Sequence, residues 1–287
     1  MKNLVIILVV VLISASSYGI GKKHSYSDTT FNNIEFEEIT FILDKRTQDT
    51  LQIEGLLKQK TFIDGIPCYG SISFHMDWRL KNFTLAGDHI FGNHLFPKDT
   101  YVGICIDRFS LEAGHFKTIG GDTVNTCRFK SNQIINGLTC DGEEVIFTTE
   151  WNLRACILSD DDTIAGNLIE KGTLAKFDEN GSIWIYCLYD PIIQGHHCLG
   201  TNYKFWMGGG GICFYPNGQL KYFRPVDDVE VQGVWCRSSS MTWGISLYES
   251  GKLMKCSSAK DQTIGGVFYT KKTTLEFDED GNVINSK

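Results

Sequence analysis

The residues best suited to bind a metal ion are His196, His197 and Cys198, with His89 and His94 forming a second pair. Imidazole and thiolate are common zinc ligands. Neighbouring residues of a strand point to opposite faces, so His196 and His197 reach one ion only if a turn separates them. No further ligand follows at the spacing of a zinc site. We therefore expect no metal site and no cofactor.

Two acidic segments, at residues 178–181 and 278–282, have the oxygen ligands that calcium prefers. Both lack the distal bidentate Glu of an EF-hand loop, and Asp and Asn are also the residues that hairpin turns favour. Further acids recur at equivalent places, at residues 160–162 and 227–228. We predict that all four segments are turns and that the last two are solvated.

Catalytic motifs are missing from the sequence. Ser238–Ser240 has no nucleophile elbow around it, and Gly208–Gly211 lacks the Lys-Ser/Thr pair of a phosphate-binding loop. We therefore assign no catalytic residue. One enzymatic alternative stays open, a hydrolase of a polymer with two carboxylates about 5–10 Å apart in an aromatic-lined groove. Its candidate acids are Asp77, Asp107 and Glu150.

The tryptophans are the best indication of a binding surface. If they share an exposed face, they make a stacking surface for a glycan or a protein partner, whereas on the buried face they fill the core. The candidates are Trp151, Trp184, Trp206, Trp235 and Trp243.

A repeat must position these residues. One half of it begins with an apolar or aromatic residue, has Leu, Ile or Val six positions later, and recurs every 30 to 42 residues. Its copies are Phe74–Leu80, Cys105–Leu111, Phe147–Leu153, Phe177–Ile183, Phe214–Leu220, Leu247–Leu253 and Phe277–Val283. Near-regular periods of this size indicate a repeat architecture.

The other half is Ile or Val, any residue, then Gly, and it alternates with the first half along the chain. Its copies are Ile53–Gly55, Ile90–Gly92, Ile135–Gly137, Ile164–Gly166, Ile193–Gly195, Val231–Gly233 and Ile264–Gly266. Two extra copies, Ile63–Gly65 and Ile119–Gly121, fall outside this alternation. The second lies in the longest gap, which suggests an insertion in that unit.

The first half of the repeat predicts a β-hairpin. Asn180-Gly181 is a turn pair, because Gly accepts positive φ and Asn tolerates it. A three-residue loop with a Gly bulge pairs Phe177 with Ile183 and leaves both on one face. A two-residue loop would instead place Phe177 opposite Trp184. We favour the first register, because the apolar pair recurs at this spacing.

A lone hairpin is barely stable, so the units must stack into one long twisted antiparallel sheet with a continuous apolar face. Phe214-Tyr-Pro-Asn-Gly-Gln-Leu220 resembles the core of the MORN repeat in its bacterial variants, and the resemblance covers roughly residues 50–283. It implies an all-β, open, solenoid-like fold. A seven-bladed β-propeller is the alternative, although units near 33 residues are short for four-stranded blades.

The chain divides into three parts in this interpretation. Residues 1–19 have the basic, apolar and small-residue regions of a secretory signal, residues 20–48 predict a capping strand or short helix, and residues 49–287 hold the seven units. We expect a protein that is secreted, extracellular or periplasmic, with no membrane insertion after the signal is removed. The net charge of −7 argues against nucleic acid as a partner.

Ten cysteines follow the signal, and an even number in a secreted chain favours disulfides. The candidates are Cys68, Cys105, Cys127, Cys140, Cys156, Cys187, Cys198, Cys213, Cys236 and Cys256. Equivalent strands of successive units lie about 9–10 Å apart, too far for a bridge between equivalent cysteines. Bridges are therefore expected between adjacent strands. Together these features predict a secreted, non-enzymatic repeat protein that binds a protein or glycan through its sheet surface.

Overall fold

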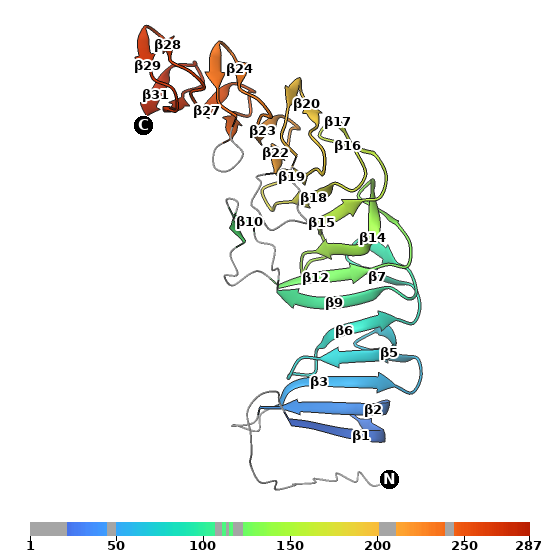
Figure 1. Cartoon of the computed structure of the whole chain (residues 1–287). Coiled ribbons are helices and arrows are strands. Elements are labelled where there is room, and N and C mark those ends of the chain that lie inside the picture. Colours follow the sequence, from blue (N-terminus) through green and yellow to red (C-terminus); the bar gives the residue numbers. More distant parts are fainter. Residues whose placement is uncertain are drawn as a thin grey trace.

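The computed structural model describes residues 22–44, 50–106, 111–112, 115–116, 123–200, 211–238 and 244–287. These residues form an elongated, curved, all-β molecule with the first strand at one end and the last strand at the other (Figure 1). The predicted signal, residues 1–19, lies outside the described residues. Among the residues that the structure describes, no helix is long and apolar enough to cross a membrane.

One open antiparallel sheet of 19 strands organises the molecule. Seventeen of them pair in chain order: β1 (Lys22–Phe31), β2 (Ile34–Leu43), β3 (Thr50–Leu57), β5 (Ile66–Phe74), β6 (Leu80–Leu85), β9 (Tyr101–Ile106), β12 (Thr123–Arg128), β14 (Leu138–Phe147), β15 (Leu153–Leu158), β18 (Leu174–Phe177), β19 (Ile183–Tyr186), β22 (Ile212–Phe214), β23 (Leu220–Phe223), β26 (Ile245–Leu247), β27 (Leu253–Ser257), β30 (Thr274–Phe277) and β31 (Val283–Ser286). Because the sheet is continuous and open, the propeller alternative is wrong.

The second layer consists of short hairpins that follow one another along one side of the sheet (Figure 1). Their strands are β4 (Thr61–Ile63) with the start of β5, β7 (His89–Phe91) with β8 (His94–Phe96), β13 (Gln133–Ile135) with the start of β14, β16 (Asp162–Ile164) with β17 (Asn167–Ile169), β20 (Ile192–Ile193) with β21 (His196–His197), β24 (Val229–Val231) with β25 (Val234–Cys236), and β28 (Gln262–Ile264) with β29 (Val267–Tyr269). We call these seven the short hairpins. Successive short hairpins are separated by two strands of the main sheet.

The turns that join the main strands confirm the predicted register. Phe177 pairs with Ile183, the backbone N–H of Asp178 donates to the carbonyl of Ser182, and Gly181 closes the loop with φ 78°. The equivalent apolar pair is Phe74–Leu80, Phe147–Leu153, Phe214–Leu220, Leu247–Leu253 and Phe277–Val283 in the other sheet turns that the structure describes.

The predicted copy at Cys105–Leu111 is wrong. Cys105 in β9 pairs with Val124 in β12, and Leu111 pairs with Phe116 in the small ladder of β10 (Leu111–Glu112) and β11 (His115–Phe116). The connection from β9 to β12 takes the place of a sheet turn, which accounts for the long gap in the repeat. The extra copy at Ile119–Gly121 lies outside the described residues.

The Ile-x-Gly half of the repeat forms the short hairpins, with two corrections. Ile53–Gly55 lies inside the straight strand β3, whereas the extra copy at Ile63–Gly65 forms the true turn, with φ 51° at Asp64 and 80° at Gly65. Positive φ at both residues is typical of a type I′ turn. In the second unit the turn follows Phe91 and not Ile90, because Phe91 pairs with His94.

The core lies between the two layers. The residue that precedes each short-hairpin turn is at most 7% exposed in the first six hairpins: Ile63, Phe91, Ile135, Ile164, Ile193 and Val231. These residues pack in one cluster with the inward residues of the main strands, such as Phe36, Phe74 and Phe214. The segment predicted as a cap, residues 20–48, contributes the β1–β2 hairpin, which extends the sheet at its first edge.

The expectation of disulfides is wrong for this structure. Nine cysteines, all except Cys105, are described as free thiols, and all nine are buried. They are Cys68, Cys127, Cys140, Cys156, Cys187, Cys198, Cys213, Cys236 and Cys256. Most of them point into the core, where a thiol packs as a small apolar group. Even Cys140 and Cys156, whose thiols lie close enough to interact, are free and not bridged.

Candidate functional site

The three described tryptophans among the candidates do not share one surface. Trp151 is half-buried and stacks on Phe91 with ring centroids 4.1 Å apart, against the core. Trp184 lies on the opposite face of the main sheet, where its Nε1–H donates to Asp178 at 2.9 Å. Trp235 lies on the outer side of a short hairpin, below the ammonium of Lys260 at 4.1 Å. Trp206 and Trp243 lie outside the described residues.

The two adjacent histidines, His196 and His197, also lie on different surfaces. His196 packs its ring on Phe223 at 4.7 Å, and burial lowers its pKa, whereas His197 is exposed beside Ile192. The two rings therefore point to opposite sides of the hairpin, as the strand geometry predicts. Within the described part of the chain, no group of three His, Cys, Asp or Glu side chains is placed to hold a metal ion.

The recurring acids close turns. Five aspartates each accept a hydrogen bond of 2.7–2.9 Å from the backbone N–H ten residues later, at the base of a short hairpin: Asp88, Asp161, Asp190, Asp228 and Asp261. In the last sheet turn, Asp278 accepts from the backbone N–H groups of Asp280 and Asn282. The carboxylates thus satisfy backbone donors of the turns in which they lie.

The clearest functional surface is a row of exposed apolar side chains on the short hairpins, which the tryptophan argument did not include. Each short strand places one side chain in the core, and the neighbouring residue points outward. The outward side chains Phe62, Ile90, Leu95, Ile134, Leu168, Ile192 and Phe268 are each 63–78% exposed. We call these seven residues the outer row.

The outer row follows from the geometry of the hairpins. In each short hairpin the outward positions of the two strands face each other, as Ile90 faces Leu95 and Thr163 faces Leu168. Six of the seven hairpins carry at least one exposed apolar member of such a pair. The remaining hairpin, β24–β25, carries Trp235 opposite Glu230. The sequence signal was a second apolar residue before the turn, as in Phe62-Ile63, Ile90-Phe91, Ile134-Ile135 and Ile192-Ile193.

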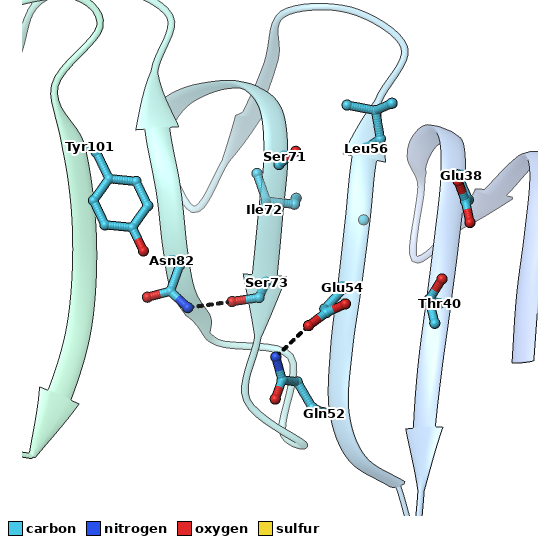
Figure 2. A pocket seen from close by; sticks show the side chains of 11 residues that line it. Glu38, Thr40, Gln52, Glu54, Leu56, Ser71, Ile72, Ser73, Asn82 and Tyr101 are labelled. Atoms are coloured by element: carbon cyan, nitrogen blue, oxygen red, sulfur yellow. Dashed lines mark hydrogen bonds between the residues drawn. The ribbon is translucent and has the colours of Figure 1, made fainter. Parts of the chain in front are cut away.

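A second feature lies on the other face of the sheet. A hollow of about 460 Å³ crosses strands β2, β3, β5, β6 and β9 near the first edge. Figure 2 shows its side chains, which include Glu38, Thr40, Glu54, Ser73, Asn82 and Tyr101. We call it the polar hollow. Sequence reasoning missed it, because its residues are the polar positions that alternate with core residues along ordinary strands.

The acids proposed for a hydrolase lie apart from this hollow. Asp77 forms an ion pair of 2.6 Å with Arg79 in its own turn, Glu150 accepts from the hydroxyl of Thr149, and Asp107 lies outside the described residues. The polar hollow has a different pair, Glu38 and Glu54, on neighbouring strands. Thr40 pairs with Glu54, so Glu38 is the diagonal neighbour of Glu54. The Cα atoms of such diagonal neighbours lie about 7–8 Å apart.

Comparison with known proteins found no matching family model, no matching curated protein and no matching solved structure. The outer row and the polar hollow are therefore the surfaces from which a function is inferred.

Proposed function

We propose that this protein is a non-catalytic scaffold that binds another protein along the outer row. The observation that supports the proposal is the exposure of seven large apolar side chains at the outward positions of six of the seven short hairpins. Single exposed apolar residues are common on protein surfaces, but contiguous apolar patches mark interaction sites. Here the repeat places such residues on hairpin after hairpin.

The form of the row favours an elongated protein partner. Two strands of the main sheet separate successive hairpins, so neighbouring outward side chains lie about 10 Å apart. Seven residues of an α-helix rise about 10.5 Å, so a helix with one apolar side chain per heptad matches this period. The net charge of −7 disfavours nucleic acid and anionic membranes. The resemblance to MORN repeats and the secreted location remain part of the proposal.

The test is quantitative proximity cross-linking of the purified protein to the surface and medium proteins of its source. The triple variant Ile134→Ser, Leu168→Ser, Ile192→Ser removes the centre of the row, and exposed positions tolerate such changes within about 0.5 kcal/mol each. Ile284→Ser is the matched control, since Ile284 is 64% exposed but lies in the edge strand β31. A partner that the wild type and the control enrich and the triple variant loses supports the proposal. Equal enrichment by all three proteins contradicts it.

A second candidate is a hydrolase acting at the polar hollow. The carboxylate pair Glu38–Glu54 favours it, because glycosidases use two carboxylates about 5–10 Å apart. Release of new reducing ends from a neutral polysaccharide, lost in Glu54→Gln, supports this candidate. Equal release of reducing ends by the variant would assign the activity to a contaminant and would contradict the hydrolase candidate.

A further inference from the structure

The polar hollow has a floor of fixed cross-strand neighbours. Thr40 pairs with Glu54, Glu54 with Ser73, Ser73 with Asn82, and Asn82 with Gly103, so one row crosses five strands. With strands about 4.8 Å apart, this row is about 19 Å long. The alternate residues of the same strands, such as Ile53, Phe74 and Phe83, are buried in the core and hold the floor rigid.

Hydrogen bonds orient the polar groups before any ligand arrives. The Nδ2 of Asn82 donates to the Oγ of Ser73 at 2.7 Å, and the Nε2 of Gln52 donates to an Oε of Glu54 at 2.7 Å (Figure 2). These two bonds leave groups that can form hydrogen bonds with a ligand. They are the hydroxyl hydrogen of Ser73, the Oδ1 of Asn82 and the second oxygen of Glu54. Donors and acceptors therefore alternate along the floor, which suits vicinal hydroxyl groups, since each hydroxyl both donates and accepts.

Tyr101 supplies an aromatic surface at one end of the row. It is half-buried, and Gly103 beside it leaves the space that the ring uses: a Cβ on Gly103 would lie 3.3 Å from the Tyr101 ring and 2.9 Å from the Oδ1 of Asn82. A larger residue would displace both groups. An aromatic ring beside a row of polar groups suits a ligand with apolar and polar edges.

The charge of the hollow disfavours anionic ligands. Among the described residues, its lining includes Glu38 and Glu54 but no Lys, Arg or His. Like charges across an interface cost affinity, so phosphates, sulfates and uronates are disfavoured.

We propose that the polar hollow is a binding site for a neutral oligosaccharide, which lies across the strands with one sugar ring against Tyr101. The site is on the sheet face opposite the layer that carries the outer row, so it is independent of the protein partner proposed above. The inference concerns binding, and it requires no cleavage of the sugar.

The test is a titration of the ¹⁵N-labelled protein, followed by the amide signals of Ser73 and Gly103, with cellohexaose, N-acetylchitohexaose, laminarihexaose, mannohexaose and trigalacturonate. We expect at least one neutral hexasaccharide to bind with a millimolar or lower Kd, and trigalacturonate to produce no shift. Tyr101→Ala weakens neutral binding tenfold or more. The control variant Ile284→Ser, in the edge strand β31 at the far end of the sheet, leaves it unchanged.

Two outcomes overturn the proposal. The first is no shift with any neutral hexasaccharide at about 10 mM, tenfold above a Kd of about 1 mM. The second is equal binding by Tyr101→Ala and the wild type. The variant Glu38→Gln, Glu54→Gln tests the role of the two carboxylates in selecting a neutral ligand. We expect it to gain binding of trigalacturonate, because both negative charges are removed. Continued exclusion of trigalacturonate by this variant contradicts the role assigned to the two carboxylates.

Discussion

At the scale of single residues, two tryptophans occupy backbone positions that glycine holds in the later units. Trp78 and Trp151 have φ 65° and 67° at the place where Gly181, Gly218 and Gly251 have φ 78–87°. A left-handed conformation costs a residue with a Cβ about 1–2 kcal/mol. Each indole offsets this cost by stacking, Trp78 on Phe31 at 4.7 Å and Trp151 on Phe91 at 4.1 Å.

We therefore expect Trp151→Gly to destabilise the protein, although it relieves the strain of the left-handed backbone conformation. Loss of a buried indole costs about 3–5 kcal/mol, less for a half-buried ring, and relief of strain returns about 1–2 kcal/mol. The expected net decrease in the free energy of unfolding is about 1–3 kcal/mol, measured by urea denaturation. Gly281→Ala is the control for strain alone, since Gly281 has φ 88° and no atom near its Cβ position. A Trp151→Gly variant as stable as the wild type would show that strain outweighs stacking.

The buried thiols give a second prediction at this scale. Burial raises the pKa of Cys68 and Cys213 to about 12, and only the thiolate reacts with alkylating agents. We expect iodoacetamide at pH about 8, near the pKa of a free thiol, to modify the nine described cysteines slowly in the folded protein. In denaturant without reductant, it should modify all nine quickly. Mass spectrometry counts the added groups. Cysteines that stay unmodified after unfolding would reveal disulfides and contradict the free-thiol structure.

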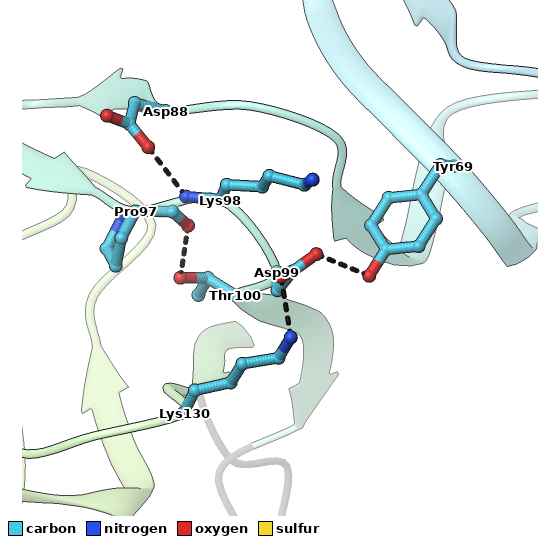
Figure 3. A network of polar contacts seen from close by, with 7 residues as sticks. All are labelled: Tyr69, Asp88, Pro97, Lys98, Asp99, Thr100 and Lys130. Atoms are coloured by element: carbon cyan, nitrogen blue, oxygen red, sulfur yellow. Dashed lines mark hydrogen bonds and ion pairs between the residues drawn. The ribbon is translucent and has the colours of Figure 1, made fainter.

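At the scale of elements, one polar network ties two connections between strands to the strand β5. The carboxylate of Asp99, before β9, accepts from the hydroxyl of Tyr69 in β5 and from the ammonium of Lys130, before β13, both at 2.6 Å (Figure 3). The ammonium of Lys130, followed by the Tyr69 hydroxyl, lowers the pKa of Asp99, while Asp99 raises the pKa values of Tyr69 and Lys130.

The signs of these shifts predict how the network depends on pH. A lowered carboxyl pKa stabilises the fold above the unfolded pKa of about 3.9, and this contribution is lost as the pH falls through the folded pKa. The raised pKa values stabilise it below about pH 10, and that contribution is lost as the pH rises further. Asp99→Asn should therefore lower the Tm slightly near neutral pH, and by less at an acidic pH where the carboxyl is protonated in the folded protein as well. Asn tolerates the φ of 70° at this position, so the variant tests charge and not strain. An equal Tm difference at both pH values would contradict this account.

The sequence predicts some elements better than others, for physical reasons. The register of Phe177 and Ile183 was predictable, because a Gly bulge and a six-residue spacing fix it. The Ile-x-Gly pattern was ambiguous, because glycine has two uses. Gly65 allows a positive φ in a turn, whereas Gly55 makes room for the Phe36 ring, which would lie 2.5 Å from a Cβ there. The polar hollow depends on which strands become neighbours, and no local sequence pattern predicts which strands pair.

At the scale of the whole molecule, the repeat builds two faces with different chemistry. Every main strand pairs with its neighbour in the chain, so the molecule grows by adding units along one axis (Figure 1). Equivalent residues then form rows, and any outward position that repeats becomes a surface feature as long as the hairpin layer. The outer row and the polar hollow are both consequences of this growth, on opposite faces.

The same growth predicts an extended particle in solution. A compact chain of 287 residues has a radius of gyration of about 19 Å. The 17 strands that pair in chain order, each about 4.8 Å from the next, exceed this compact limit along the axis of the sheet. Small-angle X-ray scattering of the monomer should therefore give a radius of gyration clearly above about 19 Å and an asymmetric distance distribution. A value near the compact limit would mean that the sheet closes on itself or folds back. The outer row and the polar hollow would then lack the open surfaces on which both binding proposals depend.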